Sequence, residues 1–182
     1  MKKRLRATHG FTLVEVLISI AVSMIIMVAA TNLLVAGFNM YNQTSLLSQA
    51  HTLGMVTEQK ITNEVIYATG VSIAPASVSA LNAGVHSLYL SADARLARDT
   101  GTAGGANTHD YNYYAGYYTG LSLAITYSKS PAGALHVDIK VLDKKSGSLL
   151  YEPQTDIVIN NGAVDTSAAA SGPAITYSLP NG

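Results

Sequence analysis

The chain has 182 residues, enough for one domain of ordinary size with an appendage. Its 11 basic and 11 acidic side chains give a formal net charge of zero, but four of the basic ones lie in the first ten residues, which leaves 7 basic against 11 acidic side chains in the remainder. Such a mildly acidic surface offers no electrostatic basis for nucleic-acid binding. The absence of cysteine excludes a disulfide framework and thiolate metal sites.

The chain begins with a short basic leader that ends at Gly10, and a strongly apolar run occupies residues 11–37. This run exceeds the ~20 residues needed to cross a bilayer. Because backbone groups in lipid must be satisfied internally, we expect it to be a transmembrane helix. The basic leader should stay on the cytoplasmic side, which predicts that the C-terminal part lies outside.

One carboxylate, Glu15, lies just inside the apolar run, and no Asp, Glu, Lys or Arg follows it from Val16 through Thr57. A charge at membrane depth is costly and usually has a functional partner. The alternative is that the Glu15 side chain is simply protonated in the membrane. The pattern therefore marks Glu15 as a candidate functional residue, with a protonated carboxyl as the competing interpretation.

The segment Gly10-Phe11-Thr12-Leu13-Val14-Glu15-Val16-Leu17 resembles the N-terminal signal of type IV pilins, of the pseudopilins of type II secretion and of competence pilins. The resemblance covers the leader and the first part of the helix, and beyond about residue 40 only the general layout is similar. It implies that a prepilin peptidase cuts after Gly10 and methylates the new terminus of Phe11. It also implies that Glu15 pairs with the amino group of Phe11 on a neighbouring subunit, so that Phe11 and Glu15 serve assembly.

The same resemblance implies a structural role in a filament and not an enzyme. The expected partners are other copies of the chain, other pilins, the peptidase, an inner-membrane platform protein and a cytoplasmic ATPase. Before assembly the chain would be a single-pass protein of the cytoplasmic membrane, and afterwards part of an extracellular or periplasmic filament. The residues show no catalytic site, metal site, cofactor site or nucleic-acid site.

Three alternatives remain open at the level of sequence. Many major pilins carry a proline about twenty residues into the mature chain, where this one reads Ala30-Thr31-Asn32-Leu33, so a minor pilin or pseudopilin that primes or caps a filament is possible. A membrane-anchored binding protein that never polymerises is the second. The third is signal-peptide cleavage before Thr31, although the apolar run exceeds the ~7–15 residues of a signal-peptide core.

The apolar run is expected to continue as an amphipathic helix over residues 38–69, with Gly70 as its stop, because apolar positions recur at spacings of three, four and seven. The apolar positions that share one face are Leu46, Ala50, Leu53, Ile61, Val65 and Ala68. Residues 70–182 are predicted to form a β-rich head. The expected fold class is therefore α+β, with a long N-terminal helix whose second half packs on an antiparallel sheet.

Runs rich in β-branched and aromatic residues predict the strands of this head. The expected strands are residues 85–90, 121–127, 135–141, 148–152, 156–159 and 174–179, with a turn at 143–147. Strict alternation of apolar and polar residues over residues 135–141 predicts a strand with one buried and one solvent-exposed face. Residues 93–107 are expected to form a short helix and a glycine-rich loop.

A cluster of tyrosines is the remaining candidate feature of the head. Its members are Tyr111, Tyr113, Tyr114, Tyr117 and Tyr118. Tyrosine combines a large apolar ring with a polar tip, so the cluster could pack against the sheet or a neighbouring subunit, or bind a partner at the surface. Asn42-Gln43-Thr44 matches a glycosylation sequon, a pattern that also arises by chance.

Overall fold

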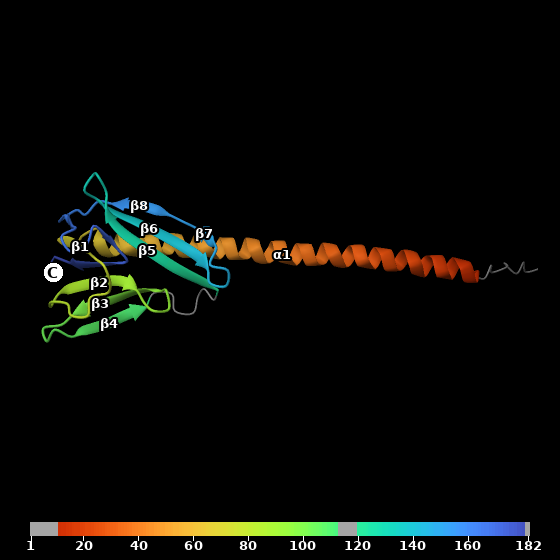
Figure 1. Cartoon of the computed structure of the whole chain (residues 1–182), viewed down its shortest axis with the longest axis horizontal. Helices are drawn as coiled ribbons and strands as arrows, with labels where there is room; N and C mark the ends of the chain where they lie inside the picture. The colour runs from red at the N-terminus through yellow and green to blue at the C-terminus, as the bar shows by residue number, and fades with distance from the viewer. Residues whose placement is uncertain (1–10, 113–119, 181–182) are drawn as a thin grey trace, which may run out of the picture. The chain divides into compact units, whose positions relative to one another are not determined.

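The computed structural model of the chain describes residues 11–112 and 120–180. Helix α1 runs from Leu13 to Val65 without interruption (Figure 1). The chain divides between Ser45 and Leu46 into two compact units. The first unit contains the N-terminal part of α1, and the second contains the C-terminal part of α1 together with all the strands.

The sequence explains why α1 is continuous, because no proline occurs before Pro75. The helix ends at Val65, a few residues before the expected stop at Gly70. The carbonyl oxygen of Val65 accepts from the Ala68 amide at 3.0 Å. The two carbonyl groups just after the helix have partners far along the chain: the Asn160 amide donates to that of Ile66 at 3.0 Å, and the Asn161 side-chain amide donates to that of Tyr67 at 3.3 Å. Residues distant in sequence therefore hold the segment that follows the helix end.

The first sheet has six strands in the order β4-β3-β2-β11-β1-β9. Its strands are β1 (Gly70–Ala74), β2 (Val85–Leu90), β3 (Leu96–Gly101), β4 (Asn107–Asn112), β9 (Val164–Asp165) and β11 (Ala174–Ser178). Neighbouring strands are antiparallel except β1 and β9, which pair in parallel. The C-terminal strand β11 lies between β1 and β2, so it ties the end of the chain into the middle of the sheet.

The second sheet is built on the long hairpin of β5 and β6. Its strands are β5 (Leu121–Lys129), β6 (Leu135–Asp143), β7 (Leu149–Tyr151), β8 (Gln154–Ile157) and β10 (Ser171–Gly172). Burial alternates along both β5 and β6, as the sequence of residues 135–141 predicts. Gly133, at a φ of 85°, closes the hairpin turn, where its amide donates to the Ser130 carbonyl oxygen at 2.8 Å.

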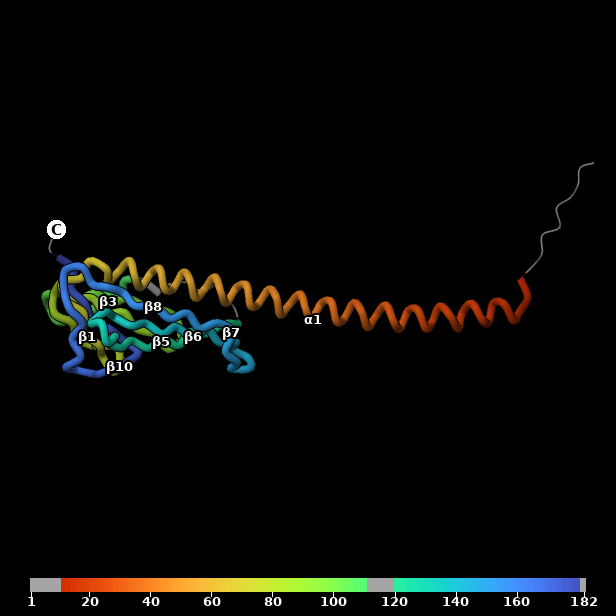
Figure 2. The backbone as a smooth tube through the Cα atoms, turned by 90° about the horizontal axis from the view of Figure 1, so that it is seen from above, coloured from red at the N-terminus to blue at the C-terminus, as the bar shows by residue number. Residues whose placement is uncertain are grey.

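The C-terminal part of α1 lies along one side of the strands (Figure 2) and shares one hydrophobic core with both sheets. Three of the predicted contact residues, Leu53, Ile61 and Val65, are buried there, and Leu46 is half-buried at the edge. The sheets contribute alternate residues of their strands to the same core. The expected α+β arrangement is confirmed.

One expectation for the head is wrong in detail. Residues 96–101 form strand β3 where we expected a short helix, and β3 turns back into β4 through a tight turn in which the Thr102 amide donates to the Ala106 carbonyl oxygen at 3.1 Å. Leu96 is fully buried, so core packing decides the conformation of this segment over local propensity. The strands form two sheets, and the expected antiparallel pairing holds among the described strands except between β1 and β9.

Candidate processing and assembly segment

Thr12 caps the start of α1. Its hydroxyl oxygen accepts a hydrogen bond from the Glu15 amide at 3.3 Å, and its carbonyl oxygen accepts one from the Val16 amide at 3.2 Å. Thr12 and Glu15 have the spacing of a capping box, in which the threonine and the glutamate together satisfy free amides of the first turn. Glu15 therefore lies in the first turn of α1, at the positive end of the helix dipole.

The helix that follows is apolar on its whole circumference and exposed throughout. An 18-residue window of α1 is long and apolar enough to cross a membrane, and none of that window is buried in the described part of the chain. Phe11, at the start, is 79% exposed. A helix that is apolar on all sides requires lipid or other apolar helices around it.

The hydroxyl groups in this apolar segment are satisfied within the helix itself. Ser19 donates to the carbonyl oxygen of Glu15 at 2.7 Å, Ser23 to that of Ser19 at 2.7 Å, and Thr31 to that of Met27 at 2.9 Å. These groups need no external partner in an apolar environment. Within residues 11–40, the only Asp, Glu, Lys, Arg or His side chain is the carboxylate of Glu15.

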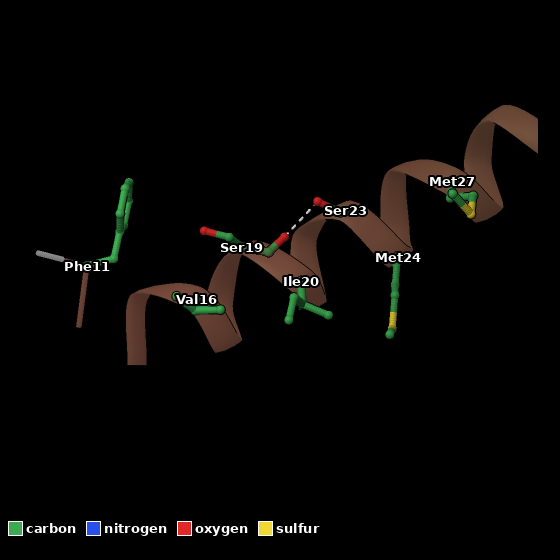
Figure 3. Close-up of a pocket in the computed structure, with 7 residues that line it drawn as sticks. All are labelled: Phe11, Val16, Ser19, Ile20, Ser23, Met24 and Met27. Atoms are coloured by element: carbon green, nitrogen blue, oxygen red, sulfur yellow. Dashed lines mark hydrogen bonds between the residues drawn. The ribbon is translucent and has the colours of Figure 1, made fainter. Parts of the chain in front are cut away.

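A shallow depression runs along one face of the first turns of α1 (Figure 3). It is lined by Phe11, Val16, Ser19, Ile20, Ser23, Met24 and Met27. Val16, Ile20 and Met24 follow one another at intervals of four residues and form one row, and Ser19 and Ser23 form the next (Figure 3). The lining contains no titratable side chain, so the surface suits helix packing and offers no group for acid–base chemistry.

In the head, a partly buried polar network holds the last turn of α1 on the first sheet. An Arg98 amino group donates to both Glu64 carboxylate oxygens at 3.1 and 3.0 Å, and the Tyr177 hydroxyl donates to one of them at 2.7 Å. The other side of Arg98 forms an ion pair with Asp110 at 3.2 Å. His86 lies beside this cluster, and both burial and the Arg98 charge lower its pKa below the ordinary value.

Two further histidines pair with carboxylates at the surface of the head. His109 contacts Asp99 at 2.7 Å, and His136 contacts Asp156 at 2.6 Å. Asp156 also accepts a hydrogen bond from the Ser130 hydroxyl, so the carboxylate, and not the histidine, lies between the other two groups. This order does not activate a serine nucleophile. Among the described residues, no group of three or more His, Asp or Glu side chains could hold a metal ion.

The structure places only part of the residues singled out from the sequence. Phe11 and Glu15 lie at the start of α1, whereas Gly10 is outside the described residues. Tyr113, Tyr114, Tyr117 and Tyr118 are outside them as well, and Tyr111 is described only as a backbone position in β4. The role of the tyrosine cluster stays a prediction.

Two features were missed from the sequence. The Thr12 cap could have been found, because a threonine three residues before a glutamate and ahead of an apolar run is the pattern of a capping box. The network of Glu64, Arg98 and Tyr177 had no such signal, because its members are separated by up to 113 residues.

Comparisons with known proteins agree with this geometry. Residues 5–31 match the family model described as the prokaryotic N-terminal methylation motif. The fold is similar to that of the PilB minor pilin from Streptococcus sanguinis, with a TM-score of 0.51 and 12% identity over 70% of this chain and 33% of that one. A mutant of the same minor pilin gives a TM-score of 0.54 and 13% identity over 71% of this chain and 35% of that one. A comparison with curated protein sequences finds no significant match.

The chain thus spans about a third of the length of the solved structures that it resembles. It carries the leader motif of pilins at its N-terminus and has a pilin-like α+β fold. The resemblance to type IV pilins expected from the sequence is confirmed at this level.

Proposed function

We propose that this chain is the precursor of a structural subunit of a type IV pilus-like filament. It is cleaved between Gly10 and Phe11, methylated at Phe11 and polymerised through the N-terminal part of α1. The observation that carries the proposal is the combination of a methylation motif at residues 5–31 with an unburied apolar helix that has one acid in its first turn.

Each part of this combination has a physical role in the proposal. Before assembly, lipid surrounds the exposed apolar helix, and in a filament other such helices replace the lipid. The hydroxyls of Ser19, Ser23 and Thr31 are already satisfied, so the exchange leaves none of them unpaired. The ionisable groups of the segment would then be the Glu15 carboxylate and the amino group that cleavage would create on Phe11.

These two groups are complementary in an apolar helix bundle. Removing one partner of a buried ion pair costs roughly 3–5 kcal/mol, because the other charge stays buried. Within one chain, the Glu15 amide is held by the Thr12 hydroxyl in the cap, which places the carboxylate at the helix start. We therefore propose that Glu15 of one copy pairs with the Phe11 amino group of the next and sets the axial register.

Mass spectrometry of sheared surface filaments tests the proposal. We expect the chain to be present with Phe11 as its methylated first residue. Gly10→Val should leave the leader attached and remove the chain from filaments, whereas Ala7→Val, a substitution of similar size within the leader, should be processed normally. A mature terminus at Thr31 would contradict the proposal and indicate ordinary signal-peptide cleavage.

A minor pilin that primes or caps a filament is the second candidate. The similarity in fold to the Streptococcus sanguinis minor pilin favours it, as does the absence of proline from the apolar run. The same mass spectrometry distinguishes the two roles by abundance. A major subunit would dominate the sheared material, whereas a minor subunit would be present in few copies per filament.

A further inference from the structure

A cluster of four polar side chains on β2, β3 and β4 adjoins the end of α1. His86 on β2 stands directly opposite Thr100 on β3, and its Nδ1 atom lies 2.8 Å from the Thr100 hydroxyl oxygen. An Arg98 amino group lies 3.4 Å from the same Nδ1 atom. The Thr100 hydroxyl is also within hydrogen-bonding distance of the Asp110 carboxylate. Through Arg98, the cluster is connected to Glu64 in the last turn of α1.

An irregularity in the sheet brings Asp110 into this cluster. The register between β3 and β4 shifts between Arg98 and Asp99, so that Asp110 is an extra residue on β4. Its carboxylate thereby reaches both the Arg98 Nε atom, at 3.2 Å, and the Thr100 hydroxyl. A bulge of this kind redirects a side chain that a regular ladder would place elsewhere.

The contacts within the cluster cannot all be favourable hydrogen bonds at once. The Thr100 hydroxyl has a single proton, which it can give either to His86 or to Asp110. The Arg98 guanidinium can only donate, so the His86 Nδ1 atom suits it only when this nitrogen carries no proton. The cluster therefore has two consistent states, which differ in the proton on Nδ1.

The two states assign different partners to the Thr100 hydroxyl. When His86 is neutral with its proton on Nε2, Nδ1 accepts from both Thr100 and Arg98, and Asp110 is held by the Arg98 Nε atom. When His86 is charged, Nδ1 donates to Thr100, and the Thr100 hydroxyl donates to Asp110. The contact between His86 and Arg98 then joins two donors of like charge, which is unfavourable.

The surroundings of His86 set the balance between the two states. The titratable and charged groups that face it are Arg98 on β3, Asp110 on β4, Glu64 on α1 and Tyr177 on β11, whose ring lies 5.3 Å from the imidazole. Burial and the Arg98 charge disfavour the charged imidazole, whereas the carboxylates of Asp110 and Glu64 favour it. A histidine with opposing influences of this kind changes its charge within the range in which the pH outside a cell varies.

We infer that His86, Thr100, Asp110 and Arg98 form a pH-sensitive latch on the end of α1. Protonation of His86 turns the Thr100 hydroxyl to Asp110 and displaces Arg98 from the imidazole. Because another amino group of Arg98 holds both carboxylate oxygens of Glu64, this displacement weakens the attachment of the last turn of α1 to the first sheet. Acidification thus loosens this joint before the rest of the head.

The first test measures the protonation of His86 directly. The full chain with ¹⁵N-labelled histidine is titrated in detergent micelles by NMR from about pH 8 to about pH 5, and the His86 signals are assigned by their loss in His86→Gln. We expect the neutral ring to carry its proton on Nε2. Thr100→Val, which removes the hydroxyl and keeps the shape, should lower the pKa of His86 further, with at least about a threefold increase in its acid dissociation constant, because charge-assisted hydrogen bonds are the stronger ones. Thr100→Ser should leave it within about 1.5-fold of the unsubstituted chain.

The second test measures the attachment of α1 by amide hydrogen exchange and mass spectrometry. Rates in the unsubstituted chain are divided by those in His86→Gln at each pH, which cancels the intrinsic pH dependence of exchange. On acidification from about pH 8 to about pH 5, this ratio should rise at least about threefold over residues 62–69 and stay within about 1.5-fold over the β5–β6 hairpin. A neutral His86 with its proton on Nδ1, an unchanged or raised pKa in Thr100→Val, or an equal change of the exchange ratio in both segments would overturn the inference.

Discussion

Substitution of Leu53 by alanine tests how the C-terminal part of α1 is held in the head. Leu53 is 4% exposed and belongs to the core shared by α1 and both sheets. Leucine to alanine removes the equivalent of three methylene groups, or ~2.4 kcal/mol of transfer free energy, and an uncollapsed cavity raises the total into the range of ~2–5 kcal/mol. The slightly higher helix propensity of alanine recovers only a few tenths of a kcal/mol.

Leu47 provides a matched control on the same helix. Its side chain is 49% exposed, so Leu47→Ala should change the free energy of unfolding by less than ~0.5 kcal/mol. The assay is unfolding of the full chain in a mild nonionic detergent, followed by the near-ultraviolet circular dichroism of its tyrosines. The chain has no tryptophan, and Tyr127 and Tyr177 are buried reporters of the head.

A loss of ~3 kcal/mol should lower the melting temperature of a head of this size by roughly 10 °C. The reasoning would be refuted if Leu53→Ala unfolded within ~0.5 kcal/mol of the unsubstituted chain. It would also be refuted if the exposed Leu47→Ala were equally damaging.

Three further outcomes are expected. The Glu15→Leu chain should be processed and inserted normally but should incorporate poorly into filaments when no unsubstituted chain is present. The Phe11 amino group would lose its carboxylate partner at a cost of ~3–5 kcal/mol per subunit. Normal incorporation would show that the axial register is set elsewhere. Tyr177→Phe should lower the free energy of unfolding by ~1.5–3 kcal/mol, because the Tyr177 hydroxyl donates to the Glu64 carboxylate. Tyr127→Phe should be neutral or stabilising, because no described residue bonds its buried hydroxyl. Equal effects of the two substitutions would contradict this contrast. Folding lowers the pKa of His86 from 6.5, so the unfolded chain binds the proton more readily. The free energy of unfolding should therefore fall as the pH drops below about 6.5. The same measurement on His86→Gln should show a smaller fall.

The N-terminal segment could be predicted from the sequence nearly in full, because its conformation depends on residues close to one another in the chain. An apolar run without proline in a low-dielectric environment can satisfy its backbone only as a helix. Thr12 and Glu15 lie within hydrogen-bonding reach in one turn, so the start of α1 is also encoded locally. The role of Glu15 in assembly stays a proposal, since it depends on a second copy of the chain.

Strands with a clear alternation could be predicted as well. Burial along β5 and β6 follows the sequence because each of these strands presents one face to the core and one to water. The prediction failed for residues 96–101, where Arg98, Asp99 and Thr100 interrupt the apolar pattern. Their polar side chains have partners on α1 and on the neighbouring strands, which no local pattern reveals.

By itself, the sequence determined the basic leader, the apolar helix, its single acid, its cap and the strand-rich character of the head. Each of these depends on residues within a few positions of one another. Only the tertiary structure decided the placement of β11 between β1 and β2, the hydrogen bonds of Asn160 and Asn161 to the segment just after α1, and the ion pair of Arg98 with Glu64. These contacts join residues far apart in the chain, and their partners are selected by the packing of the whole core, which local propensity does not specify.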